Sequence, residues 1–401
     1  MNAEVPRPRA LVVTLDPALG GGVRTMQRAV CEAQERLGFS VHVAFPRAGR
    51  LARWALRVRS ETIDGRAAFS VGYMPSIEYL NYTVPALLLR RTFRDFPLVH
   101  VVSGCHSLAM IPALAQKPFV SWVATAFIDE VRSQRDADHP TLSARINNAL
   151  SPINCALEGW SLRQARAVLA LSSYTERSLA ATAGLGPERL RLLRCPVDTA
   201  RFSPDGPCLA ELPRPYILTV GRVDDGRKNH PALLRVFSHL ARTHNDLSLV
   251  VVGEIAERSP VRALAADLGL SERVAYVGPF EGDRLAAAYR GAELFVLTSR
   301  QEGLGIVILE AQASGVAPVI MRCGGGEELI RDGVDGWAIE QGDEEGLARL
   351  VTRLLASTDT RRAAGESARR RVEAEGSFSV FDCKLLEVYR EVFPAAGVAL
   401  E

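Results

Sequence analysis

Residues 294–310 read LFVLTSRQEGLGIVILE and carry the most informative pattern of this chain. The apolar run Leu294–Leu297 predicts a buried strand, because short runs of this kind are typical of sheets that are covered on both faces. Gly303 and Gly305 allow a tight turn after it. From Ile306 onward the sequence is typical of a helix. This order of strand, glycine-rich turn and helix predicts one repeat of a parallel α/β sheet.

Two carboxylates flank this turn. Glu302 is expected in the loop and Glu310 in the first turns of the helix. A carboxylate accepts hydrogen bonds from paired hydroxyls, so both residues suit a sugar or a ribose. The free N–H groups at the start of the helix suit a phosphate or another anion. The alternative is that Glu310 is an acid on the helix surface, stabilised there by the helix dipole.

Short apolar runs and helical patterns alternate along most of the chain. The predicted strands are residues 10–15, 41–45, 98–102, 119–124, 168–171, 190–193, 216–220, 247–252, 274–277, 294–297 and 317–320. The helical patterns between them include residues 23–37, 174–183, 231–242, 261–268, 284–290 and 306–314. In such sheets ligands bind outside the carboxyl ends of the strands, so site residues are expected in the loops that follow strands.

A proline-rich stretch, residues 196–215, divides the strands into two series. Five prolines and little periodicity are typical of a linker between domains. We therefore predict an α/β protein with two Rossmann-like doubly wound domains that face each other across a cleft. The predicted domains are residues 1–198 and 216–380, joined by a linker over residues 199–215.

Two more loops contain residues that suit a phosphate. Gly20-Gly21-Gly22 follows the first predicted strand, and its glycines let a ligand approach the backbone at the start of the next helix. Arg222 and Lys228 share the loop after the strand that ends near Gly221. An arginine fork and a lysine point charge together suit a diphosphate. The alternatives are a tight strand–helix turn and a solvated loop.

The composition excludes several classes of protein. Of the 401 residues 47% are hydrophobic and 23% are charged, which is typical of a globular chain. No run approaches the roughly 18 apolar residues of a membrane span, and the N-terminus lacks the layout of a signal peptide. The seven cysteines are scattered, so we expect a reducing cytoplasm and neither a disulfide framework nor a zinc site. The net charge of +2 does not indicate a nucleic-acid binder.

The charge is unevenly distributed. Residues 1–200 hold 24 basic and 16 acidic side chains, with arginine clusters near residues 50–57 and 90–94. These clusters fit an anionic membrane surface, a solvated face or a docking site for an anionic acceptor. Asp136 and Asp138 resemble a metal-binding Asp-x-Asp, but they lie in a polar stretch before Pro140. We interpret them as part of a surface loop.

From Gly221 and Arg222 through Lys228 to the spacing of Glu302 and Glu310, the chain resembles the family 4 glycosyltransferases of GT-B architecture. The resemblance covers most of the chain, although Glu327 stands where the family usually has proline. The supporting segments are residues 20–22, 171–177, 197–204, 325–333 and 378–389. In this family the C-terminal helix usually returns to the first domain, which implies that residues from about 381 to 401 pack on it.

The resemblance implies a role for each matching residue. Arg222 and Lys228 would bind the diphosphate of a nucleotide-sugar donor, Glu302 the transferred sugar and Glu310 the ribose. The resemblance further implies donor contacts by Gly21, Gly22, Gly278, Phe280, Gly303, Leu304, Gly305 and Ile306, with Gly278 and Phe280 near the nucleobase. The two cations would stabilise the departing diphosphate without a metal, and the sugar would keep its anomeric configuration.

One departure concerns the first domain. Many relatives have a histidine after the strand that matches residues 119–124, and this chain has none there. His106 is the nearest candidate for a catalytic contact, although a lone histidine is equally typical of a structural hydrogen bond. Asp129 and Glu130 are candidate acceptor-side residues, or ordinary acids at a helix start.

The sequence thus predicts a cytoplasmic, metal-independent and cofactor-independent bacterial enzyme. It would transfer a hexosyl-type sugar, with retention, from a nucleotide-diphosphate sugar to an acceptor hydroxyl of a glycan, a lipid or a small metabolite. Contact with the inner face of the membrane through the basic N-terminal domain is a further expectation, and nucleic acid is not an expected partner. The alternatives are a nucleotide-sugar epimerase or hydrolase of the same fold, and a non-catalytic nucleotide-sugar-binding subunit.

Overall fold

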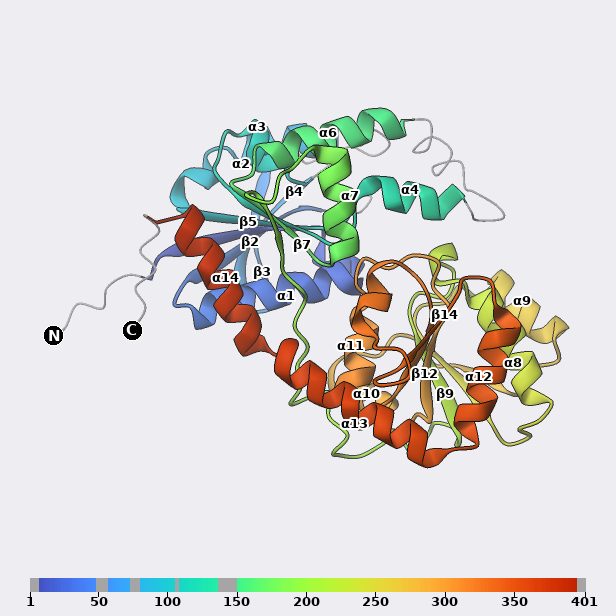
Figure 1. Cartoon of the computed structure of the whole chain (residues 1–401). Helices are drawn as coiled ribbons and strands as arrows, with labels where there is room; N and C mark the ends of the chain where they lie inside the picture. Colours follow the sequence, from blue (N-terminus) through green and yellow to red (C-terminus); the bar gives the residue numbers. More distant parts are fainter. Residues whose placement is uncertain (1–6, 48–56, 73–79, 105–107, 136–149, 395–401) are drawn as a thin grey trace. The chain divides into compact units, whose positions relative to one another are not determined.

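The structure, a computed structural model, describes residues 7–47, 57–72, 80–104, 108–135 and 150–394. The chain forms two compact units (Figure 1). Unit 1 comprises residues 1–132, 141–195 and 378–401, and unit 2 comprises residues 133–140 and 196–377. Each unit is an α/β domain with its own hydrophobic core.

Unit 1 is built on an eight-stranded sheet in the order β3-β4-β2-β1-β5-β6-β7-β8. Its strands are β1 (Arg9–Val13), β2 (Ser40–Arg47), β3 (Val58–Ile63), β4 (Arg66–Gly72), β5 (Leu98–Ser103), β6 (Val120–Val123), β7 (Ala167–Ala170) and β8 (Leu190–Leu192). Its helices are α1 (Gly21–Arg36), α2 (Leu80–Leu89), α3 (Met110–Leu114), α4 (Phe127–Arg135), α6 (Ser151–Arg163), α7 (Ser173–Ala183) and α14 (Phe378–Val392). Short 3-10 helices span Pro17–Leu19 and Thr92–Asp95.

The β3–β4 hairpin departs from the sequence prediction. All other neighbouring strands of unit 1 pair in parallel, but β3 and β4 pair antiparallel, with Ile63 opposite Arg66. Asp64 and Gly65 form the turn with positive φ angles of 50° and 76°. An Asp-Gly pair favours this conformation, which matches the twist of a two-residue hairpin. The prediction contained neither strand, because their solvent-facing positions are polar and give no continuous apolar run.

Unit 2 contains a six-stranded sheet in the order β11-β10-β9-β12-β13-β14, parallel throughout. Its strands are β9 (Tyr216–Val220), β10 (Ser248–Val252), β11 (Val274–Tyr276), β12 (Leu294–Leu297), β13 (Pro318–Met321) and β14 (Trp337–Ile339). Its helices are α8 (His230–Ala241), α9 (Pro260–Asp267), α10 (Gly282–Arg290), α11 (Ile306–Ala313), α12 (Glu344–Leu355) and α13 (Thr358–Glu375), with 3-10 turns at Gly226–Lys228 and Gly325–Leu329.

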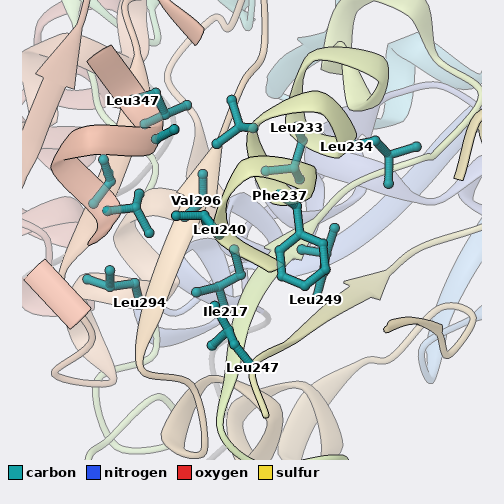
Figure 2. Close-up of a cluster of buried hydrophobic side chains, with 14 of the residues drawn as sticks. Ile217, Leu233, Leu234, Phe237, Leu240, Leu247, Leu249, Leu294, Val296 and Leu347 are labelled. Carbon is teal, nitrogen blue, oxygen red and sulfur yellow. The ribbon is translucent and has the colours of Figure 1, made fainter. Parts of the chain in front are cut away.

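The core of unit 2 lies between the sheet and two neighbouring helices, α8 and α12. Figure 2 shows Leu233 and Phe237 of α8 packed against Ile217 of β9 and Val296 of β12, with Leu347 of α12 beside them. All five side chains are almost completely buried. Burying a side chain of this size stabilises the fold by about 1.5–3 kcal/mol. The packed sheet thereby fixes the carboxyl ends of β9 and β12, where the candidate site residues begin.

Helix α14 belongs to unit 1, although it follows the last element of unit 2 in sequence. The buried Tyr389 hydroxyl accepts a hydrogen bond from Gln34 Nε2 at 2.7 Å and lies 2.6 Å from His100 Nδ1. Arg36 of α1 makes a bidentate ion pair with Asp382 of α14, at 2.6 and 2.9 Å. Burial lowers the pKa of His100 to about 3, so the imidazole is neutral in this network.

Candidate donor site in unit 2

The first part of the site is the loop after β9, residues 221–229. Asp225 caps its 3-10 turn by accepting a hydrogen bond from the Arg227 backbone N–H at 3.1 Å. The same carboxylate binds the guanidinium groups of Arg222 and Arg227, each at 2.8 Å. Burial by itself would raise the pKa of Asp225. The hydrogen bonds and positive charge of Arg227, together with the charge of Arg222, outweigh burial and lower the pKa to about 2. Asp225 therefore stays ionised and holds both arginines at the strand end.

Lys228 ends this turn and contacts the predicted sugar-binding acid. Its Nζ donates to Glu302 Oε1 at 2.6 Å, and both side chains are mostly buried. The aliphatic stem of Lys228 lies along Gly221, since a Cβ atom there would come within 3.3 Å of two of its carbons. Any side chain at Gly221 would push the lysine aside. The structure therefore brings together Lys228 and Glu302, which are 74 residues apart in sequence.

The loop after β12, residues 298–305, is tied to its neighbours through its backbone. Arg300 N–H donates to the carbonyl of Arg227 at 2.7 Å, which joins it to the β9 loop. Glu302 N–H donates to the carbonyl of Cys323 at 2.7 Å, and the carbonyl of Glu302 accepts from Gly325 at 3.0 Å. Glu302 is thus fixed between the loops that follow β9 and β13.

Helix α11 begins directly after this loop, as predicted. Gly305 precedes the helix with a φ of 81°, and a Cβ atom there would lie 2.8 Å from Ile308 Cδ1. The backbone conformation therefore favours glycine, and a side chain here would also displace the end of the Ile308 side chain. No side chain of the described residues caps this helix, so the first N–H groups of Ile306 and Val307 are available to an anion. Gly303 lies in the same loop, and Leu304 is buried.

Glu310 is buried in α11, which argues against the helix-surface alternative. Only 9% of the residue is exposed. The Tyr289 hydroxyl of α10 lies 2.9 Å from Glu310 Oε2 and 3.1 Å from the carbonyl of Val307. Burial raises the pKa of Glu310 to about 7, an effect that the bond from Tyr289 only partly offsets. A buried carboxyl with this pKa is the kind of group found at functional sites.

Two further predicted residues lie at the carboxyl end of β11. Gly278 has a φ of 73°, and its carbonyl accepts a hydrogen bond from Gly253 at 2.9 Å. Phe280 is 7% exposed, and the Arg284 guanidinium lies over its ring at 4.1 Å. One face of the Phe280 ring is therefore covered by the Arg284 guanidinium.

The remaining candidates belong to unit 1. Gly21 is the first residue of α1 and has a φ of 76°, and Gly22 follows it in the helix. Asp129 and Glu130 lie in the first turn of α4, where Asp129 is 2% exposed and its Oδ1 is 3.8 Å from Arg132. His106, Asp136 and Asp138 lie outside the described residues.

The sequence prediction missed several polar residues that support the site. Ser299 and Tyr289 each bond one of the two glutamates, and the Gln341 side chain donates to the carbonyls of Ser299 and Arg322 at 2.5 and 2.8 Å. Asp225 holds the two arginines. Ser299 lies within residues 294–310, the motif that opens the sequence analysis. Its spacing from Glu302 does not predict a contact, because the conformation of the loop between them cannot be predicted from the sequence. No sequence signal pairs Tyr289 or Gln341 with the site.

Two family models match most of the chain. The model for glycosyltransferase family 4 matches residues 20–201, and the model for group 1 glycosyl transferases matches residues 209–371. These two stretches correspond closely to the main parts of units 1 and 2.

Curated relatives match over shorter stretches. A GDP-mannose-dependent α-(1-6)-phosphatidylinositol monomannoside mannosyltransferase of Mycobacterium tuberculosis is 31% identical over 258 residues, which is 58% of this chain and 66% of the relative. A D-inositol 3-phosphate glycosyltransferase of Acidothermus cellulolyticus is 34% identical over 203 residues, which is 47% of this chain and 45% of the relative. The matched stretches therefore span less than two thirds of the length of either relative.

Solved structures share the fold over nearly the whole chain. A sucrose-phosphate synthase from Thermosynechococcus elongatus has a TM-score of 0.80 at 21% identity and covers 97% of this chain and 100% of its own. HepE of Anabaena, in complex with UDP and glucose, has a TM-score of 0.73 at 16% identity, over 96% of this chain and 100% of its own. Both likenesses concern the fold, two parallel-dominated α/β domains of the GT-B type. The two family models together match residues 20–201 and 209–371, and they show that this chain belongs to the family 4 glycosyltransferases.

Proposed function

We propose that this protein transfers a hexosyl sugar from a nucleotide-diphosphate sugar to an acceptor hydroxyl, with retention of configuration. The observation that carries the proposal is the Lys228–Glu302 pair, held at 2.6 Å beside the uncapped start of α11. A cation, a carboxylate and free backbone N–H groups are the three kinds of group that a sugar diphosphate requires. The activities in the names of the relatives support the same reaction class.

The donor would be held by unit 2. Lys228 Nζ has one bond within the described chain, so two of its three N–H groups remain for the diphosphate. Arg222 is more than half exposed and uses one of its five N–H groups on Asp225. The first N–H groups of α11 would bind a phosphate oxygen or the sugar. Glu310 would accept hydrogen bonds from the ribose hydroxyls.

The chemistry would be charge stabilisation. As the bond between the sugar and the diphosphate breaks, negative charge builds on the leaving group, where Arg222 and Lys228 stabilise it. Glu302 would orient the sugar through its hydroxyls and lie near the positive charge that develops on the ring. These groups supply the positive charge without a resident cofactor, and we accordingly propose metal-independent transfer.

GDP-mannose is the first donor to test, because the mannosyltransferase relatives use it according to their names. Incubation with GDP-mannose and a panel of hydroxyl acceptors, including inositol 3-phosphate and a phosphatidylinositol mannoside, should transfer mannose to at least one acceptor. The product should have the axial anomeric configuration of the donor. Rapid epimerisation or complete hydrolysis of the donor without an acceptor would instead support the epimerase or hydrolase alternative.

Binding without turnover would support the non-catalytic alternative. In that case a nucleotide sugar would bind to the wild-type protein but would remain intact in the presence of every acceptor of the panel. The presence of Lys228, Arg222, Glu302 and Glu310 in bonded positions favours catalysis.

The acceptor and the cellular location belong to the same proposal. Asp129 and Glu130 follow β6 in unit 1 and remain candidates for acceptor contacts. Leu87 of α2 is 73% exposed, and Arg90, Arg91 and Arg94 follow it, which fits peripheral contact with an anionic membrane in the cytoplasm. No helix among the described residues is long and apolar enough to cross a bilayer. Flotation with vesicles containing anionic lipid, compared with neutral vesicles, tests the contact.

A further inference from the structure

We propose that Ser299 is a positioning residue that fixes the orientation of the Glu302 carboxylate toward the transferred sugar. The inference rests on the proposed function, in which Glu302 contacts sugar hydroxyls. Ser299 itself contacts no ligand in this account. It acts through the carboxylate that it binds.

The two oxygens of Glu302 have different surroundings. Oε1 accepts two hydrogen bonds, from Lys228 Nζ at 2.6 Å and from Ser299 Oγ at 2.7 Å. Oε2 accepts no hydrogen bond from the described part of the chain. Two donors on one oxygen hold the carboxylate in a single orientation and leave the other oxygen, with both lone pairs, for a ligand.

Ser299 is itself held rigidly. It is completely buried and is the second residue after β12. Its carbonyl accepts a hydrogen bond from Gln341 Nε2 at 2.5 Å, and the same amide donates to the carbonyl of Arg322 at 2.8 Å. Gln341 thereby clamps the ends of β12 and β13 together. Since Glu302 also bonds the loop after β13 through its backbone, the serine and its acceptor are fixed to the same frame.

Ser299 becomes most important when the donor is bound. A diphosphate that binds the two remaining N–H groups of Lys228 also draws the ammonium away from Glu302, because both are anions that a lysine can bind as a point charge. The serine hydroxyl is a neutral donor and is completely buried, so a diphosphate attracts it less than it attracts the charged lysine. It would therefore keep Oε1 in place when the lysine turns toward the diphosphate. Without it, the carboxylate would follow the lysine and lose its alignment with the sugar.

The test compares Ser299→Ala with a control, Ser314→Ala, which removes another buried serine hydroxyl in unit 2. Turnover is measured as GDP release from GDP-mannose in the presence of a hydroxyl acceptor that receives mannose, and affinity as the Kd for GDP. Ser299→Ala should lower kcat roughly tenfold to a hundredfold, the range for loss of a hydrogen bond to a charged group. Its Kd for GDP should change less than threefold, and Ser314→Ala should change neither value. Equal losses in kcat and GDP affinity would contradict a role confined to the sugar.

A double-mutant cycle shows whether Ser299 acts through Glu302. Ser299→Ala should lower kcat in the wild-type background and have little further effect in Glu302→Gln. The same fold loss in both backgrounds would overturn the proposal. Gln341→Ala should give a smaller loss of the same kind, and it keeps the test decisive if Ser299→Ala folds poorly. A wild-type protein that neither binds nor turns over any nucleotide sugar would refute the proposed function itself, whereas an active wild-type enzyme with an unaltered Ser299→Ala variant would refute only the role of Ser299.

Discussion

Glu310 gives the sharpest pH-dependent prediction. Burial raises its pKa to about 7, against an ordinary value of 4.5. Ribose hydroxyls donate hydrogen bonds, so they bind the ionised carboxylate better than the protonated one. With a pKa of about 7 the group is roughly 90% ionised at pH 8 and roughly 10% ionised at pH 6. The affinity for GDP-mannose should therefore fall about tenfold between pH 8 and pH 6.

Isothermal titration calorimetry at pH 6, 7 and 8 measures this effect. GDP-mannose is a suitable ligand, because its diphosphate diester has no group that titrates in this range. Glu310→Gln is the matched control: it should bind more weakly than wild type at pH 8 and show no such slope. A wild-type affinity that is constant from pH 6 to pH 8, or an equal slope in Glu310→Gln, would refute the assignment of the ribose to Glu310.

The same group makes an opposite prediction for stability. The pKa of Glu310 is higher in the folded protein than in the unfolded chain, so its ionisation costs stability as the pH rises from 4.5 to 7. The full cost above pH 7 is about 3 kcal/mol. Without ligand, Glu310→Gln should therefore have a higher free energy of unfolding than wild type at pH 8, and it should unfold at a higher temperature. At pH 5 the difference in free energy of unfolding should shrink to less than about 1 kcal/mol. An equal gain at both pH values would contradict the pKa shift.

Three further substitutions test single contacts. Glu302→Gln should lower kcat by at least tenfold with little change in GDP affinity, measured by steady-state kinetics and calorimetry; loss of GDP binding would mean that the roles of Glu302 and Glu310 are exchanged. Tyr289→Phe removes the bond to Glu310 and should weaken GDP-mannose binding about tenfold at pH 8, whereas unchanged affinity would show that Tyr289 serves only the fold. Tyr389→Phe leaves Gln34 and His100 without their bond to the hydroxyl and should lower the free energy of unfolding by about 1–3 kcal/mol, measured with a denaturant. The control Tyr276→Phe removes a buried hydroxyl that has no partner in the described chain, so it should lower this free energy much less. Equal losses would contradict a stabilising role for the hydrogen bonds of Tyr389.

Much of the fold could be predicted from the sequence, because the strands of parallel sheets are buried on both faces. Strands β9 and β12 were predicted with the bounds that the structure shows, and α11 begins at the predicted Ile306. Elements that lack a continuous apolar run were missed. The β3–β4 hairpin is half exposed, and β14 has only three residues, of which Trp337 alone is buried.

The site could be predicted only in part. A motif such as residues 302–310 locates acids in a strand–loop–helix unit, because local spacing follows from local structure. It does not show that Glu302 bonds a lysine 74 residues earlier or that Gln341 clamps the same loop, because those contacts depend on tertiary packing. The sequence predicts that Arg222 and Lys228 bind the same diphosphate, and the structure adds Asp225 as the residue that holds Arg222 in place.

The central claim is that unit 2 binds the diphosphate of a nucleotide sugar through Lys228. Thermal unfolding with UDP-, GDP-, ADP- and TDP-sugars tests it most directly, with wild type and Lys228→Ala measured side by side. At one hundred times its Kd, a ligand stabilises the native protein by about 2.7 kcal/mol. We predict that at least one nucleotide sugar raises the unfolding temperature of wild type, and that the increase is much smaller in Lys228→Ala. No increase with any of the four, or an equal increase in both proteins, would contradict the account.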